Sequence, residues 1–171
     1  MPDSPDPPGW VRPLLEGDLA GGVPRDLVLW PDSRLRRRCE SSAFLGAAAL
    51  RRLAADMLAT MYAAGGRGLA APQVGVLFRV FVMDAGWKDG RPDPLVMLDP
   101  EILWRSSRRD SGDEKCLSIP DRVVAVSRPS TIDLGWYDLD GRHHLRQMSG
   151  PEARIAQHEA DHLDGRLILE D

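Results

Sequence analysis

Cysteine is scarce in this sequence, with only Cys39 and Cys116 in 171 residues. Two cysteines do not make a disulfide framework, so we expect a reducing environment in which a thiol stays free to bind a metal. Long apolar runs are also missing, because no stretch approaches the roughly 18 consecutive apolar residues that a membrane span needs. Both absences favour a soluble, cytoplasmic protein without membrane contact.

An excess of basic charge is absent as well, since the formal net charge is −4 at pH 7. This argues against nonspecific binding of nucleic acid or anionic membrane as the main function. The first 25 residues hold six of the 14 prolines and four of the 16 glycines, but not the basic start and apolar run of a secretory signal. We therefore expect a Pro/Gly-rich extension over residues 1–25 and a single domain over residues 26–171.

Hydrophobic periodicity predicts a helix followed by strands. Apolar residues at helical spacing indicate a helix from Ser42 to Ala64, which Gly65-Gly66 would end. The β-rich runs over 76–84 and 94–107 and the Asp140-Gly141 turn signal predict strands and a hairpin. The middle of the chain should therefore be mainly antiparallel sheet.

A second helix is expected near the C-terminus, from about Gly150 to Asp164. Ser149 and Glu152 have the spacing of a capping box, and Pro151 falls in the first turn, where its missing N–H costs nothing. The order helix, strands, helix predicts the α+β class.

This second helix carries the sequence QHEADH at residues 157–162. His158 and His162 are four residues apart, so they share one helix face and can hold one metal ion. In such sites the carboxylate after the first histidine, here Glu159, is normally the general base rather than a ligand. A polar helix that happens to carry two histidines is the simpler alternative.

A catalytic zinc-type site usually has three protein ligands, so a third is needed. Ile168 stands where one protease group has its third histidine, and residues 163–171 offer no second helix with a glutamate. The soft donor available upstream is Cys116. His143 and His144 are rivals, but adjacent strand residues point to opposite faces, and solvated hairpin histidines are the better interpretation. For Cys39 we expect a partly buried structural thiol.

A glycine-rich stretch, GRGLAAPQVG at residues 66–75, indicates a backbone that approaches something closely. A plain helix-to-strand connection is the alternative, and a phosphate-binding loop is disfavoured because no helix follows. The side-chain amide of Gln73 on this stretch could donate to a developing oxyanion.

The motifs GRGLAAPQ (66–73), EKCLS (114–118) and QHEADH (157–162), in this order, resemble those of the peptide deformylase family. The resemblance extends over residues 26–171, because DLVLWPDSRLR also resembles the family's opening strand and turn. It implies antiparallel sheets packed around a central C-terminal helix that carries HExxH, with one N-terminal helix. It also implies a hydrolase of protein biosynthesis and N-terminal processing, which removes the formyl group from the N-terminal methionine of nascent chains and releases formate.

The resemblance further implies a role for each site residue. Cys116, His158 and His162 would bind one divalent metal ion, commonly Fe²⁺ in the cell, which Zn²⁺, Ni²⁺ or Co²⁺ can replace. Glu159 would be the base, and Gln73 with the backbone N–H of Leu117 would hold the formyl oxygen. The substrate peptide would pair as an added strand with the backbone around its contact residues Gly66, Arg67 and Gly68. Around the metal, Glu114, Arg128 and Asp161 could form a buried charge network that orients the ligands.

Two residues depart from the family pattern: Lys115 stands where glycine is usual, and Arg67 where an aliphatic residue is usual. Both place long cations near the metal or the peptide path, which leaves substrate preference open. Alternatives are therefore a hydrolase of another N-formyl or N-acyl substrate, a small zinc peptidase, and a noncatalytic peptide-binding homologue. The expected partners are an N-formylmethionyl peptide or nascent chain and, transiently, the ribosome, though not through a C-terminal tail. We expect a monomer that does not bind nucleic acid.

Overall fold

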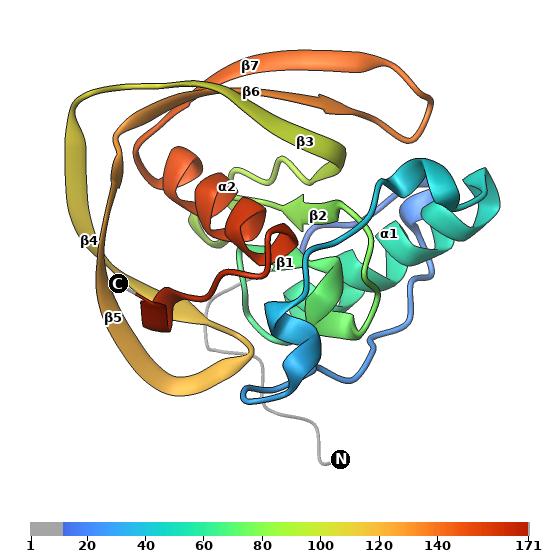
Figure 1. The fold of residues 1–171 in the computed structure, drawn as a ribbon. Coiled ribbons are helices and arrows are strands. Elements are labelled where there is room, and N and C mark those ends of the chain that lie inside the picture. Colours follow the sequence, from blue (N-terminus) through green and yellow to red (C-terminus); the bar gives the residue numbers. More distant parts are fainter. Residues whose placement is uncertain (1–11, 171) are drawn as a thin grey trace.

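The computed structural model describes residues 12–170 of the chain, with a helix on each side of a run of strands. Figure 1 follows this order from α1 to α2. The α-helices and strands are α1 (Ala47–Ala63), β1 (Gly68–Ala70), β2 (Val80–Met83), β3 (Leu95–Arg105), β4 (Arg109–Cys116), β5 (Ile119–Pro129), β6 (Thr131–Tyr137), β7 (His143–Ser149) and α2 (Gly150–Leu163).

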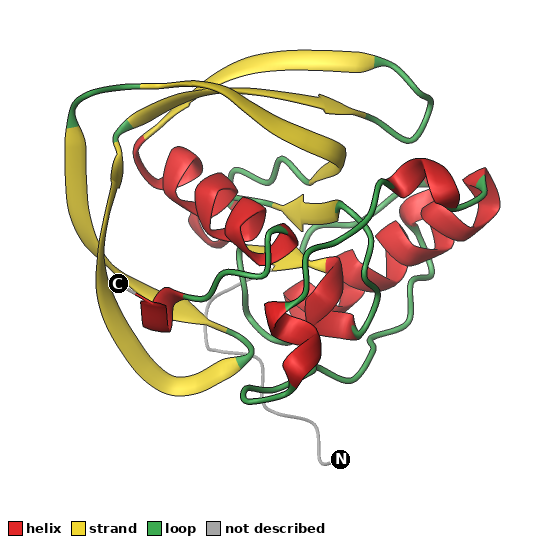
Figure 2. Cartoon of the chain, viewed as in Figure 1, coloured by secondary structure: helices red, strands yellow, loops and turns green. Residues whose placement is uncertain are grey.

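The strands form two antiparallel sheets. Five of them pair in the order β1-β2-β3-β6-β7, and β4 pairs with β5 in a long two-stranded ribbon. In Figure 2 both groups of strands curve around α2, so this helix lies in the middle of the molecule. The α+β class and the central C-terminal helix are therefore confirmed.

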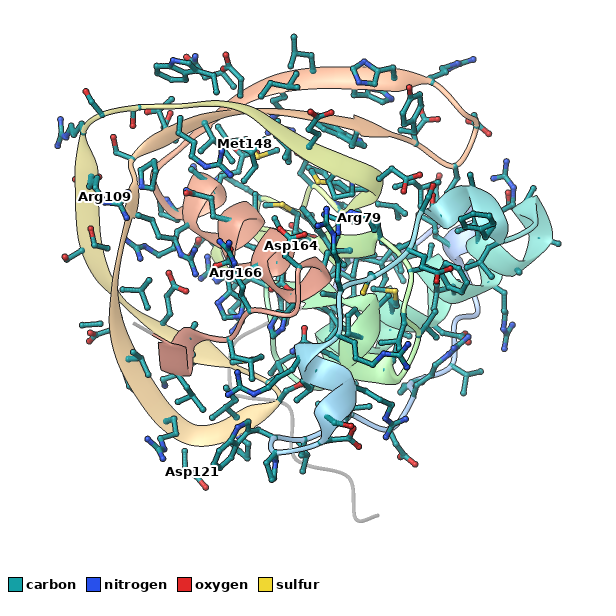
Figure 3. The ribbon with its side chains drawn as sticks, in the orientation of Figure 1. Arg79, Arg109, Asp121, Met148, Asp164 and Arg166 are labelled. Atoms are coloured by element: carbon teal, nitrogen blue, oxygen red, sulfur yellow. The ribbon has the colours of Figure 1, made fainter. Side chains whose placement is uncertain are left out.

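Helix α2 lies at the centre because one face of it is small and apolar. Ala153, Ala156 and Leu163 are fully buried there against β-strand residues such as Phe81 and Met148. Arg79, the residue directly before β2, fixes the far end of α2, because it donates to the carbonyl of Leu163 and to Asp164, each at 3.0 Å. Figure 3 labels Arg79 and Asp164 at this end of the helix.

Helix α1 packs on the first strands through a second apolar cluster. Its residues Leu58 and Met61 are fully buried together with Leu69, Val80 and Val82 from β1 and β2. The short edge strand β1 is thus supported from behind by α1, and its other edge carries no neighbouring strand in the described part of the chain.

The start of α1 differs from the expected one. Residues Ser42–Phe44 form a separate 3₁₀ turn, and the α-helix begins only at Ala47. The reason lies outside the segment, because the Asp99 carboxylate accepts hydrogen bonds from the backbone N–H and the hydroxyl of Ser42, at 2.9 and 2.6 Å. This long-range contact fixes the chain in a non-helical turn before Gly46.

The predicted capping box of α2 is wrong, although the helix itself and Pro151 in its first turn are confirmed. Ser149 occupies the N-cap position without a side-chain capping bond. Glu152 instead pairs with Arg146 of β7, with a nitrogen–oxygen distance of 2.6 Å. The Glu152 carboxylate therefore pairs with the Arg146 guanidinium of β7 instead of capping the N-terminus of α2.

The predicted Pro/Gly-rich extension falls partly outside the described residues, which begin at residue 12. Its described end contacts α1: Val23 N–H donates to the Asp56 carboxylate at 2.9 Å, and Arg25 N–H donates to the Thr60 hydroxyl at 2.9 Å. The division at residue 25 remains a prediction. None of the described helices is long and apolar enough to cross a membrane.

Candidate metal centre

Three side chains with metal-binding atoms meet beside α2. Cys116, His158 and His162 are buried, and their ligand atoms all lie within 4.8 Å of one another. His162 Nε2 is 3.2 Å from His158 Nε2 and 3.4 Å from Cys116 Sγ. Because zinc-type bonds to nitrogen and sulfur are about 2.0–2.3 Å long, one ion can reach all three atoms.

The fold explains why these residues meet. The two histidines share one face of α2 through their four-residue spacing. Cys116 ends β4, where the ribbon turns tightly, since Cys116 pairs with Ile119 across the turn. A register shift between Glu114 and Cys116 lies next to this turn. Irregular pairing of this kind re-aims side chains, and here the Cys116 thiol faces the helix.

A buried carboxylate orients the first histidine. Glu114 Oε1 lies 2.9 Å from His158 Nδ1, so Nδ1 donates and leaves the lone pair of Nε2 for a metal. Two bonds from Arg128, at 2.6 and 2.8 Å, and one from Arg154, at 2.8 Å, hold the carboxylate. Arg128 also donates to Asp161 at 2.9 Å, which confirms the predicted contacts of this network.

The electrostatics of the cluster favour a cation between the ligands. Burial raises the pKa of Glu114, but hydrogen bonds from Arg128 and His158 outweigh burial and lower it to about 2. Burial lowers the pKa of His158, but hydrogen bonding to Cys116 and Glu114 raises it to about 10, so these acceptors stabilise positive charge here. Burial and the neighbouring His158 hold the pKa of His162 well below its ordinary range, which keeps that ring neutral, as a ligand must be.

Glu159 lies next to the cluster but belongs to no ion pair of the described residues. Its Oε2 atom is buried without a hydrogen-bond partner, and a Cβ on Gly68 would lie 2.5 Å from Oε1. Burial raises the pKa of this carboxyl to about 7, with His158 acting against the rise. A carboxylate with such a pKa can accept and return a proton near neutral pH.

The side-chain amide of Gln73 points toward the Cys116 thiol. Its Oε1 accepts from the Ala70 N–H at 2.9 Å, which turns Nε2 toward Ser118 Oγ (3.1 Å) and Cys116 Sγ (3.6 Å). Leu117 lies in the turn between β4 and β5, beside Cys116. The side-chain amide thus sits within reach of anything bound beside the thiolate.

Most of the groups at the candidate metal centre border one cavity of about 750 Å³, with His162 buried behind its lining. Gly66, Gly68 and Gln73 line it on the β1 side, and Cys116 and Leu117 line it on the side of the β4–β5 turn. Residues of α2, including His158 and Glu159, complete it. The geometry can therefore bring a bound amide, a metal ion and a proton acceptor together.

The remaining candidates lie outside the metal cluster, although Arg67 lines the same cavity. Arg67 bends away from the metal centre, because its Nη1 donates to the Ala85 carbonyl at 2.6 Å and lies 3.4 Å from Asp89. His143 and His144 are exposed on β7, where His144 is paired with Asp138. Cys39 is buried in the core, and burial raises the pKa of its thiol to about 11.

Sequence reasoning missed Arg154 and Ser118. Arg154 donates to Glu114 and to the carbonyls of Val126 and Asp110, so it ties α2 to the ribbon. Its position four residues before His158 on the same helix face is a signal that could have identified it. Ser118, the last residue of EKCLS, carries no comparable signal because its partner Gln73 is 45 residues away.

Comparison with known proteins gives one consistent result. The sequence model of the polypeptide deformylase family matches residues 24–171. A curated peptide deformylase from Bartonella henselae is 39% identical over 146 residues, which cover 85% of this chain and 82% of the relative. The crystal structure of peptide deformylase from Thermotoga maritima has a TM-score of 0.80 and 34% identity, covering 86% of this chain and 96% of that one.

A second structural neighbour has a peptide bound. It is the class I type b peptide deformylase from Acinetobacter baumannii with Met-Ala-Ser, at a TM-score of 0.80 and 34% identity, covering 87% of this chain and 98% of that one. With the family match over most of the sequence, this agrees with the three motifs and the buried cysteine–histidine cluster. The chain belongs to the polypeptide deformylase family.

Proposed function

We propose that this chain is a metal-dependent peptide deformylase, which hydrolyses the formyl group from the N-terminal methionine of nascent polypeptides and releases formate. The observation that carries the proposal is the pairing of two features in one cavity. A Cys/His/His cluster with room for one ion lies beside Glu159, whose buried Oε2 has no partner among the described residues.

Cys116, His158 and His162 would hold the ion, and the donor set suits both iron(II) and zinc. We propose Fe²⁺ in the cell, with Zn²⁺, Ni²⁺ or Co²⁺ as substitutes. When bound, the ion would supply Lewis-acid chemistry, which polarises the formyl carbonyl and lowers the pKa of a coordinated water.

The side chains around the ion divide the remaining work. Glu159 would accept the proton of the attacking water at its buried carboxylate and return it to the leaving amine. Gln73 Nε2 and the backbone N–H of Leu117 would donate to the formyl oxygen as negative charge develops on it. Residues of this chain would therefore supply both the proton acceptor and the hydrogen-bond donors to the formyl oxygen.

The peptide would bind along β1. This strand is an edge of the five-stranded sheet, so the segment Gly66–Gly68, with Arg67 between the glycines, can pair with an extended chain as an added strand. Gly68 has no room for a side chain because Glu159 lies against it. The absence of a Cβ therefore lets the backbone approach the base.

Family membership supports this function over a small zinc peptidase. Retention of Glu159 and Gln73 supports it over a noncatalytic peptide-binding homologue, because a structural metal site needs neither. The proposed partners are N-formylmethionyl peptides and, transiently, the ribosome. We also propose a monomer that acts in the cytoplasm.

The test is release of formate and free amine from formyl-Met-Ala-Ser by anaerobically purified protein loaded with Fe²⁺ or Ni²⁺. Acetyl-Met-Ala-Ser serves as the matched control, since it differs only in the acyl group. Efficient release from the formyl peptide alone is the expected result. Metal bound at one equivalent with no formate from this or other formyl-methionyl peptides would overturn the proposal and direct attention to other N-formyl compounds.

A further inference from the structure

The free edge of β1 offers few backbone groups to a peptide. On the other edge, Asp84 N–H donates to the Arg67 carbonyl at 2.9 Å, so these two residues form a hydrogen-bonded pair. The next residue, Gly68, lies opposite Met83. Because bonded and non-bonded pairs alternate along antiparallel strands, the N–H and C=O of Gly68 point away from β2, toward the free edge. An added strand can therefore bond to Gly68, which lies against Glu159.

Two residues earlier on this edge is Gly66, whose N–H is used by the end of α1. Gly65 N–H donates to the Tyr62 carbonyl at 3.1 Å, and Gly66 N–H donates to the Met61 carbonyl at 2.9 Å. Gly65 has a φ of +69°. Two such bonds around a left-handed glycine are the Schellman arrangement that ends many helices. The same bond that ends α1 therefore removes the Gly66 N–H from the groups that a peptide can use.

The Gly66 carbonyl also has a partner within the protein. The Trp87 indole N–H donates to it at 2.9 Å, and only 3% of the Trp87 surface is exposed. The Leu117 side chain covers Gly66 as well, because a Cβ on Gly66 would lie 2.8 Å from Leu117 Cδ1. Both polar backbone groups of Gly66 are therefore bonded before a peptide arrives.

A buried carboxylate fixes the loop that carries Trp87. Asp84 is fully buried, and it accepts from the Tyr62 hydroxyl at 2.6 Å and from the Asp93 N–H at 2.9 Å. The Tyr62 ring meets the Trp87 ring edge-on, with 5.2 Å between the ring centroids. The tryptophan thus packs on a residue that is tied to the start of its own loop, and moving the indole away from Gly66 would break this packing.

The opposite end of the free edge is closed in a similar way. By the same alternation, Ala70 is the next residue after Gly68 whose N–H points to this edge. Ala70 N–H donates to the Gln73 side-chain oxygen at 2.9 Å, so a peptide that runs from Gly68 toward Ala70 finds this donor already used. On this edge, Gly68 alone keeps both its N–H and its C=O without a hydrogen-bond partner among the residues that the structure describes.

We propose that Trp87 limits the pairing of the peptide with β1 to one residue, the formylmethionine opposite Gly68, so that the amide of the third peptide residue adds nothing to recognition. The inference rests on the proposed function. In an antiparallel added strand, the residue opposite Gly68 is followed two positions later by the residue opposite Gly66. That third residue would need the Gly66 N–H and C=O, which Met61 and Trp87 already occupy.

The test measures kcat/KM for formyl-Met-Ala-Ala and for the same peptide with lactate as its third residue, which has an ester oxygen in place of the third N–H. Wild type should hydrolyse both equally well. Trp87→Phe keeps an aromatic ring but releases the Gly66 carbonyl, so it should favour the amide peptide by about 2- to 12-fold, the effect of one net hydrogen bond. The difference should appear in KM rather than in kcat, because this bond is the same in the ground state and the transition state.

Two controls separate this effect from general damage. Trp104→Phe removes an exposed indole on β3, outside the cavity, and should keep the wild-type ratio. Lactate at the second peptide residue removes an N–H that points away from β1, so it should not distinguish Trp87→Phe from wild type. A further measurement needs no variant: in wild type, the Trp87 indole N–H should exchange with solvent equally slowly with and without bound Met-Ala-Ser, as followed by proton NMR.

A wild-type preference for the amide peptide as large as that of Trp87→Phe would overturn the inference, and so would equal kcat/KM for the two peptides in Trp87→Phe. An indole N–H that loses its protection from exchange when Met-Ala-Ser binds would overturn it as well. Failure of the proposed function gives a different result, because then wild type hydrolyses no formyl peptide. Calorimetry on the metal-loaded protein then decides: tighter binding of Met-Ala-Ala than of its lactate counterpart by wild type would contradict the inference, and a preference seen only in Trp87→Phe would support it.

Discussion

The Glu114 carboxylate lies behind the candidate metal centre and pairs there with the positive charges of Arg128 and Arg154. Its carboxylate accepts from two arginines and from His158 Nδ1, and these contacts keep it ionised despite burial. An ionised partner fixes the tautomer of His158, so the two arginines would act on a bound metal ion only through Glu114 and His158. Arg128 and Arg154 are therefore positioning residues rather than catalytic ones.

Loss of Arg128 should weaken metal binding. We expect Arg128→Ala to lower metal affinity by about 10- to 100-fold, because Glu114 loses two of its bonds and no longer holds His158 in one orientation. Competition with a chelator measures the affinity, and the unfolding transition of the metal-free variant shows whether it folds. Arg109→Ala, which removes a surface arginine bonded to Ser127, is the control. Equal affinity in Arg128→Ala and wild type would contradict this role.

Gln73 should affect turnover without affecting metal content. Gln73→Ala removes a donor aimed past Cys116, so we expect a loss of about 10²- to 10³-fold in kcat with one metal ion still bound. Metal analysis and formate release on the same sample check both parts. If turnover is retained while metal is bound, Gln73 is not an oxyanion donor.

At the scale of elements, local patterns predicted the site helix and long-range contacts decided its details. The two histidines at i, i+4 spacing and Pro151 identified α2 from the sequence alone. This was possible because residues four apart share a helix face whatever the rest of the chain does. The capping box failed because Glu152 found Arg146 on another strand. Cys116 could be assigned only by exclusion of other ligands and by resemblance. Its distance from the histidines depends on the register of β4 and β5, which no local pattern encodes.

After α2 the chain reverses direction at Gly165. Gly165 has a φ of +74°, and a Cβ there would overlap the Arg36 carbonyl, whereas Gly141 has a φ of +80° and open space around it. Both alanine variants carry the left-handed cost of about 1–2 kcal/mol. Gly165→Ala should lose roughly 1–3 kcal/mol more stability because the backbone must also shift. Denaturant unfolding measures the difference, and equal losses for the two variants would contradict the packing described.

For the whole molecule, the N-terminal segment acts as a strap across α1. A Cβ on Gly22 would overlap the Ala55 carbonyl, so this segment lies against the helix backbone. Val23 and Arg25 then bind the Asp56 carboxylate. The sequence predicted a Pro/Gly-rich extension over residues 1–25, but composition does not reveal that Asp56, 33 residues after Val23, supplies a partner for it. Burial raises the pKa of Asp56, and the bonds from Val23 and Arg25 outweigh burial and lower it.

The strap should make stability depend on pH. A folded-state pKa below the unfolded value of about 3.9 means that ionised Asp56 stabilises the fold above that pH, and that this contribution is lost as pH falls through the folded pKa. We expect Asp56→Asn to cost about 1.5–3 kcal/mol at pH 7 and progressively less toward pH 3. Thermal unfolding across this range measures it, with Asp133→Asn on the sheet surface as control. A pH-independent difference between Asp56→Asn and wild type would contradict the assignment.

In the proposed mechanism, Cys116 and the two histidines would hold the metal ion, and Glu159 would transfer the proton. The most direct measurement determines metal per chain and formate release together for wild type, Glu159→Gln and Cys116→Ala, all loaded with Ni²⁺. We expect Glu159→Gln to keep one ion and lose turnover by about 10²- to 10⁴-fold, and Cys116→Ala to lose the ion. A Glu159→Gln protein that still releases formate at the wild-type rate, or a Cys116→Ala protein that keeps its metal tightly, would contradict the account.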